Sequence, residues 1–309
     1  MPPMTDQKTT KKTEKKQPDI ITANTVLTIK IPAKDVASAY SQAVNKLKKK
    51  LKLPGFRAGK VPTNVAEQHL DFEQVAQEAL QELLPELYTK AVAAGKHKPL
   101  TNPEFRPVKI EKGTDWEIEA HIAEKPELTL PKYAAVVKKA IQHVKKEQAE
   151  AEKKASKDKD AKTPAVPNAE ESKTHLLQHI YADLAEEFRP QVPELLVKRE
   201  IEADVREMER QLQGMKLTIA EYLSRSGQTE EAFSQQITVR AVTKLQSVLI
   251  TDAIAKEAKI TITDKDIDAK LDTLEDKDFV KKERNNPEYR SVVHQSLFNE
   301  HVHEHLLSL

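Results

Sequence analysis

Cysteine is absent from this chain of 309 residues. Its absence excludes disulfide bonds, a thiolate nucleophile and a zinc site built on cysteine sulfur. A chain without cysteine is also compatible with the reducing environment of the cytosol, where disulfide bonds are rare. We therefore expect a cytoplasmic location.

Glycine is scarce, with 6 of 309 residues, where about 7% is usual. Folds built on glycine-rich turns or phosphate-binding loops are therefore disfavoured, and a helix-rich protein is favoured. No run of about 18 apolar residues occurs, which argues against a membrane-spanning helix, and we expect no membrane partner. Residues 1–17 hold five lysines and no aliphatic run, so we expect residues 1–20 to be a disordered basic tail.

The overall charge is nearly neutral. Fifty Lys and Arg residues face 49 Asp and Glu residues, for a net charge of +1. Attraction to a polyanion must therefore come from a local cluster of charge. The length favours two domains and some linker, since about 150 residues per domain is usual.

The pattern of residues 21–130 predicts an α+β domain in which long helices lie between one strand and a β-hairpin. In the first strand Leu27, Ile29 and Ile31 alternate with more polar neighbours, as in a half-buried strand. The predicted elements are a strand at 24–32, helices at 33–53 and 63–94, and strands at 105–111 and 115–124 joined by a turn at 112–114.

Residues 131–173 are predicted to be a charged linker. Of the 29 residues from 145 to 173, 15 are charged, and Val166 is the only large aliphatic. Such a segment buries too little apolar surface to offset the entropy lost on ordering. We expect some helix before Ala155 and a loose chain around Pro164 and Pro167.

Residues 174–309 show helical periodicity without notable strands, which predicts an all-α C-terminal domain. Thr218 and Glu221 have the spacing of a capping box. The predicted helix starts are Pro193, Thr218, Thr229, Thr263 and Asn286.

A cluster of positive charge lies in the N-terminal domain, where no Asp or Glu occurs from Val36 to Ala66. Basic residues on a helix end and the loop after it can neutralise several phosphates of a nucleic acid. The alternative is that the lysines only complement the dipole at the helix C-terminus. The cluster consists of Lys46, Lys48, Lys49, Lys50, Lys52, Arg57 and Lys60.

The loop after this helix is a candidate binding tip. Gly55 and Gly59 allow positive φ angles, so the loop could display Phe56 and Arg57 outward; alternatively, Phe56 folds back onto the core. The segment ending at Lys60 is one residue short of a phosphate-binding P-loop and continues with Val instead of Ser or Thr. We expect no nucleotide cofactor.

The histidines and carboxylates do not predict an active site. His301 and His305 share a helical face, as do His175 and His179, but no third ligand with typical spacing accompanies either pair. No acid–base pair stands out among the many carboxylates. We expect no metal, no cofactor and no catalytic residue.

Residues 55–62, GFRAGKVP, resemble the GFRxGKxP loop of the bacterial trigger factor family of ribosome-associated chaperones. The segment VPELLVKREIEADVREMERQL at 192–212 is similar to a helix of that family. Further similar segments are EYLSRSGQTEEAF, ITITDKDIDAKL and NNPEYRSVV. The resemblance covers about residues 21–130 and 172–309.

The resemblance implies an ATP-independent chaperone. Residues 21–130 would bind the large ribosomal subunit beside the exit tunnel, with Phe56, Arg57 and Lys60 touching a ribosomal protein and rRNA. Gly55 and Gly59 would shape the tip. Residues 174–309 would form a helical substrate-binding domain that holds unfolded nascent chains and prevents misfolding and aggregation. The expected rRNA contacts are Lys46, Lys48, Lys49, Lys50 and Lys52.

The family usually carries an FKBP-type prolyl-isomerase domain between these two regions. Residues 125–175 contain Tyr133 as their single aromatic and no glycine, so we predict a form without that domain and without isomerase activity. The alternatives are an RNA-binding or ribosome-assembly factor with one dedicated partner, an isomerase with an unrecognised pocket, and a helical adaptor. Whether the free protein forms a homodimer stays open.

Overall fold

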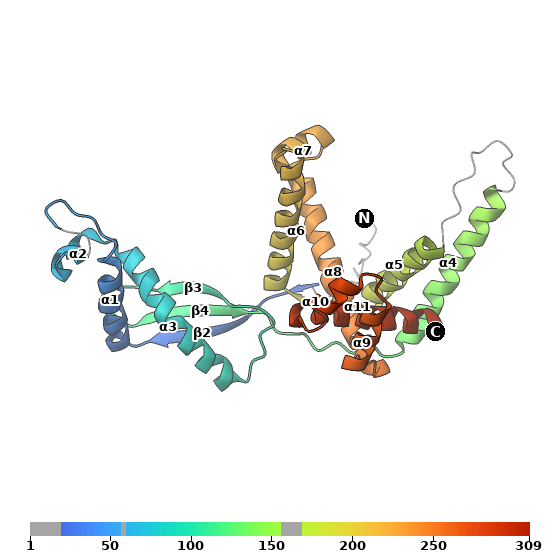
Figure 1. Cartoon of the computed structure of the whole chain (residues 1–309), viewed down its shortest axis with the longest axis horizontal. Helices are drawn as coiled ribbons and strands as arrows, with labels where there is room; N and C mark the ends of the chain where they lie inside the picture. Colours follow the sequence, from blue (N-terminus) through green and yellow to red (C-terminus); the bar gives the residue numbers. More distant parts are fainter. Residues whose placement is uncertain (1–19, 57–59, 156–168) are drawn as a thin grey trace, which may run out of the picture.

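The computed structural model describes residues 20–56, 60–155 and 169–309. It shows an α+β body at one end of an elongated molecule and a helical body at the other (Figure 1). This arrangement confirms the predicted fold class, an α+β N-terminal domain followed by an all-α domain. The predicted basic tail at 1–20 lies, but for its last residue, outside the described residues.

The N-terminal body is a three-stranded antiparallel sheet covered by helices. Ile29 and Ile31 of the first strand are buried and Val26 is exposed, which confirms the predicted alternation. The turn between the last two strands contains Gly113 at φ +79°, as a tight hairpin requires. The sheet order is β2 (Thr25–Ile31), β4 (Trp116–Ile122) and β3 (Glu104–Lys109).

The helices of this body are α1 (Ala33–Leu47), α2 (Thr63–His69) and α3 (Phe72–Gly95). The helix predicted for 33–53 ends early, because a longer helix would place Lys46 and Lys50, two like charges, one turn apart, and Pro54 disfavours helical geometry before it. The helical region predicted for 63–94 consists of two helices. The second begins at Asp71, whose carboxylate accepts from the backbone N–H of Glu73 at 3.3 Å.

The core of the helical body corrects the linker prediction for 131–173. Residues 133–155 form a helix whose Val137, Ala140 and Val144 are buried. Val137 and Ala140 pack in one cluster with Ile180 and Leu184 of the next helix. The sequence indicates some helix before Ala155, but composition hides its packing in the core, because the apolar stripe comes just before the most charged stretch. The linker residues 156–168, with Pro164 and Pro167, lie outside the described residues. The helices that build this core are α4 (Tyr133–Ala155), α5 (Ala169–Phe188), α8 (Glu230–Ala258) and α11 (Pro287–Ser308).

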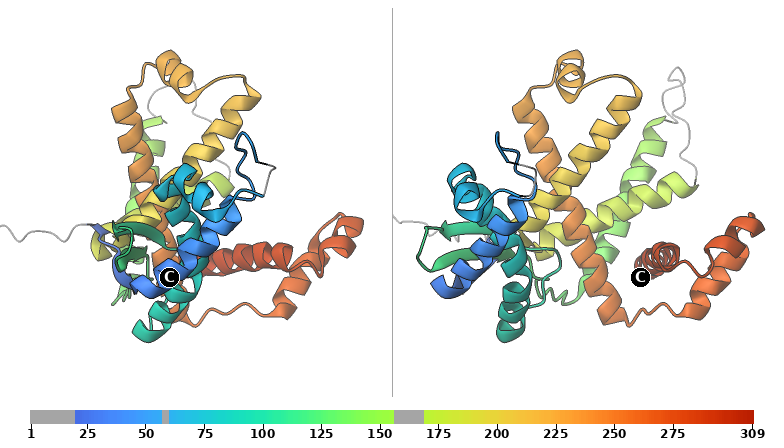
Figure 2. Two further views of the ribbon diagram at one scale, coloured as in Figure 1. Left: turned by 90° about the vertical axis from the view of Figure 1, so that its left-hand side faces the viewer. Right: turned by 60° about the vertical axis from the view of Figure 1, so that its left-hand side comes forward.

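Two projections rise from the helical body on the same side (Figures 1 and 2). One is the pair α4 and α5. The other is α6 (Glu194–Gly214), α7 (Ile219–Ser226) and the first part of α8. Thr218 and Glu221 form the predicted capping box at the start of α7, which fixes the direction of the chain at the tip.

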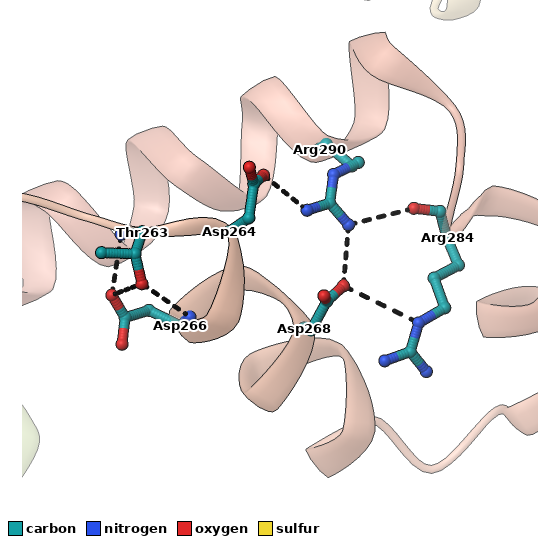
Figure 3. Close-up of polar contacts among 6 residues, drawn as sticks. All are labelled: Thr263, Asp264, Asp266, Asp268, Arg284 and Arg290. Atoms are coloured by element: carbon teal, nitrogen blue, oxygen red, sulfur yellow. Dashed lines mark hydrogen bonds and ion pairs between the residues drawn. The ribbon is translucent and has the colours of Figure 1, made fainter.

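A third unit comprises α9 (Asp264–Thr273), α10 (Lys277–Glu283) and the start of α11. Its small apolar core includes Ile267, Leu271 and Val280. Arg290 donates to Asp264 at 2.7 Å and to Asp268 at 2.8 Å. As Figure 3 shows, Arg284 joins the same network, so paired charges tie the three helices together.

The two bodies meet at α6. Strand β1 (Ile21–Thr22) pairs in parallel with β5 (Val192–Pro193) directly before this helix. The backbone N–H of Leu195 donates to the side chain of Asn24 at 2.7 Å, and Lys198 pairs with Glu104 at 2.9 Å. No helix in the described part of the chain is long and apolar enough to cross a membrane.

Candidate functional site

The candidate binding loop connects α1 with α2 at the outer end of the N-terminal body (Figure 1). Its turns are closed by backbone hydrogen bonds from Lys50 to Leu47 at 2.9 Å and from Phe56 to Leu53 at 3.2 Å. Gly55 has φ +86°, a left-handed conformation that a residue with a side chain rarely adopts. Glycine at this position therefore allows the backbone turn in the described part of the tip.

Phe56 lies at the surface of the tip, with 43% of the residue exposed. The alternative in which its ring folds onto the core does not describe the structure. Arg57 and Gly59 lie outside the described residues. Lys60, on the return side of the loop, is exposed and leads into buried Val61. An exposed phenyl ring beside cations is a common binding arrangement.

The basic cluster separates into paired and unpaired lysines. Lys46 forms ion pairs with Glu78 and Glu82 of α3, and the hydrogen bonds that Lys46 donates to these carboxylates raise the pKa of Lys46. Lys48 donates to the hydroxyl of Thr63 at 2.9 Å. Both side chains therefore fasten the loop region to its neighbouring helices.

The other lysines keep their charge available to a ligand. None of them forms an ion pair with any residue in the described ranges, and all are exposed. Together with Phe56 they line the loop and the end of α1. The unpaired set is Lys49, Lys50, Lys52 and Lys60.

Sequence reasoning missed an apolar groove in the N-terminal body. It has a volume of about 1090 Å³ and lies between α3 and the β3–β4 hairpin. The groove exists because α3 packs along α1 and β2 and leaves the side of β3 uncovered. Prolines at 85, 103 and 107 line the groove. These prolines are the sequence feature from which the groove could have been predicted. Other lining residues are Phe72, Leu80, Tyr88 and Phe105.

Tyr88 is the polar element of the groove wall. Its ring meets Phe105 edge-on, with centroids 5.7 Å apart. Its hydroxyl is buried and has no hydrogen-bond partner among the described residues. Burial raises the pKa of Tyr88, so the phenol stays protonated at neutral pH.

The helical body also exposes large apolar side chains. Met215 and Val239 are more than half exposed, at 61% and 65%, and both lie on the projection formed by α6, α7 and α8. Single exposed apolar residues are normal, but these share one projection. The exposed apolar residues of the helical body are Met215, Tyr222, Val239, Val248, Phe279 and Val292.

The histidines have structural partners. The hydroxyl of Tyr133 and Nε2 of His305 are 2.8 Å apart, which joins α4 to the C-terminal helix. Burial, and secondarily Lys173, lowers the pKa of His303. The rings of His175 and His179 are 4.6 Å apart. Within residues 20–56, 60–155 and 169–309, no three His, Asp or Glu residues are placed to hold a metal ion.

Comparison with known families accounts for nearly the whole chain. Residues 10–156 match the family described as bacterial trigger factor protein, and residues 157–307 match the C-terminus of the same family. The chain belongs to the trigger factor family. The second match begins directly after the first, and in the described part the α4–α5 pair stands at this boundary. The family resemblance of the loop and helical segments is thereby confirmed.

Trigger factors of staphylococci are similar to one part of the chain. The trigger factor of Staphylococcus carnosus (strain TM300) is 41% identical over 108 residues, which are 35% of this chain and 24% of that protein. The trigger factor of Staphylococcus aureus (strain Newman) is 40% identical over 108 residues, with 35% and 25% covered. The matched region thus spans about a quarter of these relatives.

A solved structure supports the fold over the full length. The subject of that structure is promiscuous substrate recognition in the folding and assembly activities of the trigger factor chaperone. The structural match has a TM-score of 0.57 at 13% sequence identity and covers 96% of this chain and 98% of that chain. At this identity the match shows a shared trigger factor fold.

Proposed function

We propose that this trigger factor is an ATP-independent chaperone of the cytoplasm that docks on the large ribosomal subunit and shields unfolded nascent chains. The observation that carries the proposal is the loop tip of a chain of this family, where exposed Phe56 stands among lysines that form no ion pair within the described residues. The ribosomal partners would be a protein at the exit site and neighbouring rRNA.

Docking would combine one aromatic contact with several charge contacts. Lys49, Lys50, Lys52 and Lys60 can each neutralise a phosphate, and each such contact weakens as salt rises. Gly55 shapes the tip, and Gly59 and Arg57, which lie outside the described residues, would add to its shape and its charge. Lys46 and Lys48, already bonded within the protein, would hold the loop region in place and contribute less to rRNA binding.

Client binding would use apolar surface in both bodies. The groove between α3 and the hairpin is large enough for several side chains of an extended segment. Met215 and Val239 offer further apolar contacts on the helical projection. Scattered, adaptable contacts bind many sequences weakly, and docking at the exit site would supply a high local concentration.

The loop is tested by co-sedimentation with ribosomes. The variant combines Phe56→Ala, Arg57→Ala and Lys60→Ala. The matched control combines Phe279→Ala, Lys281→Ala and Lys282→Ala, because Phe279 is 42% exposed and two lysines follow it. We expect the loop variant to stop pelleting at low salt and the control to pellet like the wild type, whose association should weaken as salt rises. Unchanged pelleting of the loop variant contradicts the loop assignment.

Chaperone action is tested by aggregation of several unrelated unfolded proteins. We expect the wild type to suppress aggregation of all of them without ATP, and Met215→Ser with Val239→Ser to suppress it less. Selective binding of one partner, with no effect on the other proteins, favours the alternative of an RNA-binding or ribosome-assembly factor. Catalysis in a prolyl-peptide assay would overturn the proposal that this trigger factor has no isomerase activity.

A further inference from the structure

A second basic segment lies in α4, outside the loop cluster. Between Glu127 and Glu147 the chain has no acidic residue, while it has five lysines. In a chain whose overall charge is nearly balanced, such a run creates a local positive field. The lysines are Lys132, Lys138, Lys139, Lys145 and Lys146.

The helix places four of these lysines on one face. Lys138 and Lys139 are followed by Lys145 and Lys146 seven residues later, which is two turns or about 10.5 Å along the axis. All four are exposed. The opposite side of α4 is committed to the core, where Val137 is fully buried. The helix cannot rotate to hide its lysines, because that would expose the core stripe.

Within the described residues, the four lysines also form no ion pair. None of them forms an ion pair with a residue in the described part of the chain, whereas Lys125 pairs with Asp252 at 2.6 Å and Lys270 with Glu300 at 2.8 Å. The only ion pair on the described part of α4 joins His143 and Glu147 at 3.8 Å. The basic face of α4, defined as Lys138, Lys139, Lys145 and Lys146, therefore keeps its charge for an external ligand.

We propose that the basic face of α4 binds the phosphate backbone of structured RNA. Contacts to a backbone require cations and no apolar anchor, and this face has no aromatic or large aliphatic residue. A protein partner would need such an anchor at the centre of its interface. A membrane surface would need the apolar face of α4, which is buried. Double-stranded RNA is recognised mostly by its shape and by contacts to its phosphates and 2′-hydroxyls, and a row of lysines can supply the phosphate contacts.

This inference goes beyond the proposed function. The docking loop lies at the opposite end of the molecule from α4 (Figure 1), so the two surfaces make separate contacts. The α4–α5 pair also stands at the boundary of the two family matches. The molecule would therefore hold RNA at a second place.

The test uses the full chain and a labelled hairpin RNA, with binding followed by fluorescence anisotropy. The variant changes Lys138, Lys139, Lys145 and Lys146 to Gln. The matched control changes four exposed lysines without ion pairs in the described residues, Lys256, Lys265, Lys281 and Lys282, to Gln. Both variants lose four charges, so only position distinguishes them. A third variant changes the four α4 lysines to Arg, and circular dichroism verifies that all variants are folded.

We expect the Gln variant of α4 to bind RNA at least about tenfold more weakly at low salt, with a shallower salt dependence, because up to four phosphate contacts are lost. The Arg variant and the matched control should bind like the wild type. Equal loss in the matched control, or wild-type binding by the α4 variant, overturns the proposal. So does stronger α4-dependent binding to duplex DNA or to polyglutamate than to RNA.

The loop variant separates this inference from the proposed function. Phe56→Ala with Arg57→Ala and Lys60→Ala should retain the RNA binding that depends on α4. If that variant still pellets with ribosomes, the docking proposal fails while the α4 proposal stands. If the α4 variant binds RNA normally and the loop variant fails to pellet, the α4 proposal fails while the docking proposal stands.

Discussion

Glu124, two residues after the end of β4, shows how one carboxylate organises a corner of the N-terminal body. It accepts from the backbone N–H of Lys98 at 3.0 Å, from the hydroxyl of Thr25 at 3.0 Å and lies 3.1 Å from Nδ1 of His97. These bonds, the one from Lys98 first, lower the pKa of Glu124. The charged carboxylate therefore stabilises the folded state, and this contribution is present above its unfolded pKa and lost as pH falls through its folded pKa.

Glu124→Gln should lower the free energy of unfolding of the N-terminal body at pH 7 by about 1 kcal/mol, since the amide cannot accept as many hydrogen bonds. The difference from the wild type should shrink as pH falls through the lowered pKa of Glu124, because the wild-type carboxyl then becomes protonated itself. Urea unfolding followed by fluorescence measures this, because Trp116, the single tryptophan, lies in this core.

The control is Glu127→Gln, which removes an exposed carboxylate with no ion pair among the described residues. Glu127→Gln should leave the unfolding curve unchanged both at pH 7 and at low pH. If Glu124→Gln lowers the free energy of unfolding by the same amount at pH 7 and at low pH, packing and not the charge is responsible.

At the scale of elements, paired charges replace a large core in the α9–α10–α11 unit. Arg290 is 22% exposed and its guanidinium bridges two carboxylates of α9. The bond from Arg290 lowers the pKa of Asp268 and raises that of Arg290. The planar guanidinium presents its donors in a rigid fork that reaches both carboxylates, whereas a lysine ammonium is a single point charge and should hold the pair less well.

Arg290→Lys should speed amide hydrogen exchange in α9 and at the start of α11 and leave exchange in α1 and α3 unchanged. Hydrogen exchange with mass spectrometry measures this by segment. Arg206→Lys serves as the control, because Arg206 makes a single exposed pair with Glu202 at 3.9 Å and should have no effect. Raised salt should reduce the difference between Arg290→Lys and the wild type; equal exchange at low salt would refute the role of Arg290.

At the scale of the whole molecule, few polar contacts join the two bodies. Asn24 accepts from the N–H of Leu195 at the start of α6, and the guanidinium of Arg199 donates to the carbonyl of Asn102 at 2.7 Å. Lys198 and Glu104 are each only partly buried. A junction held by polar contacts of this kind allows the bodies to move relative to each other.

Asn24→Ala with Lys198→Ala should broaden the distribution of distances between the two bodies, because a buried N–H is left without its acceptor. Spin labels on Lys112→Cys and Arg225→Cys measure this distribution, and the absence of native cysteine makes the labelling specific. Arg210→Ala, which removes a pair within α6 alone, should leave it unchanged. An unaltered distribution in the double variant would show that the β1–β5 pairing suffices to hold the junction.

The sequence by itself determined the local structure and the family. Alternation at Leu27, Ile29 and Ile31, the capping box at Thr218 and the glycine-containing loop are patterns of neighbouring residues, so they could be read without coordinates. The same patterns predicted an exposed tip at Phe56. Strand, helix and turn preferences act over a few residues, which is why they can be recognised in the sequence.

Only the tertiary structure determined how those elements pack and which distant residues they bring into contact. It placed Val137 of α4 against α5, paired Lys46 with residues 32 and 36 positions away, and left a groove between α3 and β3. These outcomes depend on which distant segments pack, and core-facing and ligand-facing apolar residues have the same periodicity. Free and bonded lysines likewise look identical in a sequence, because an ion pair is a property of two positions that only folding brings together.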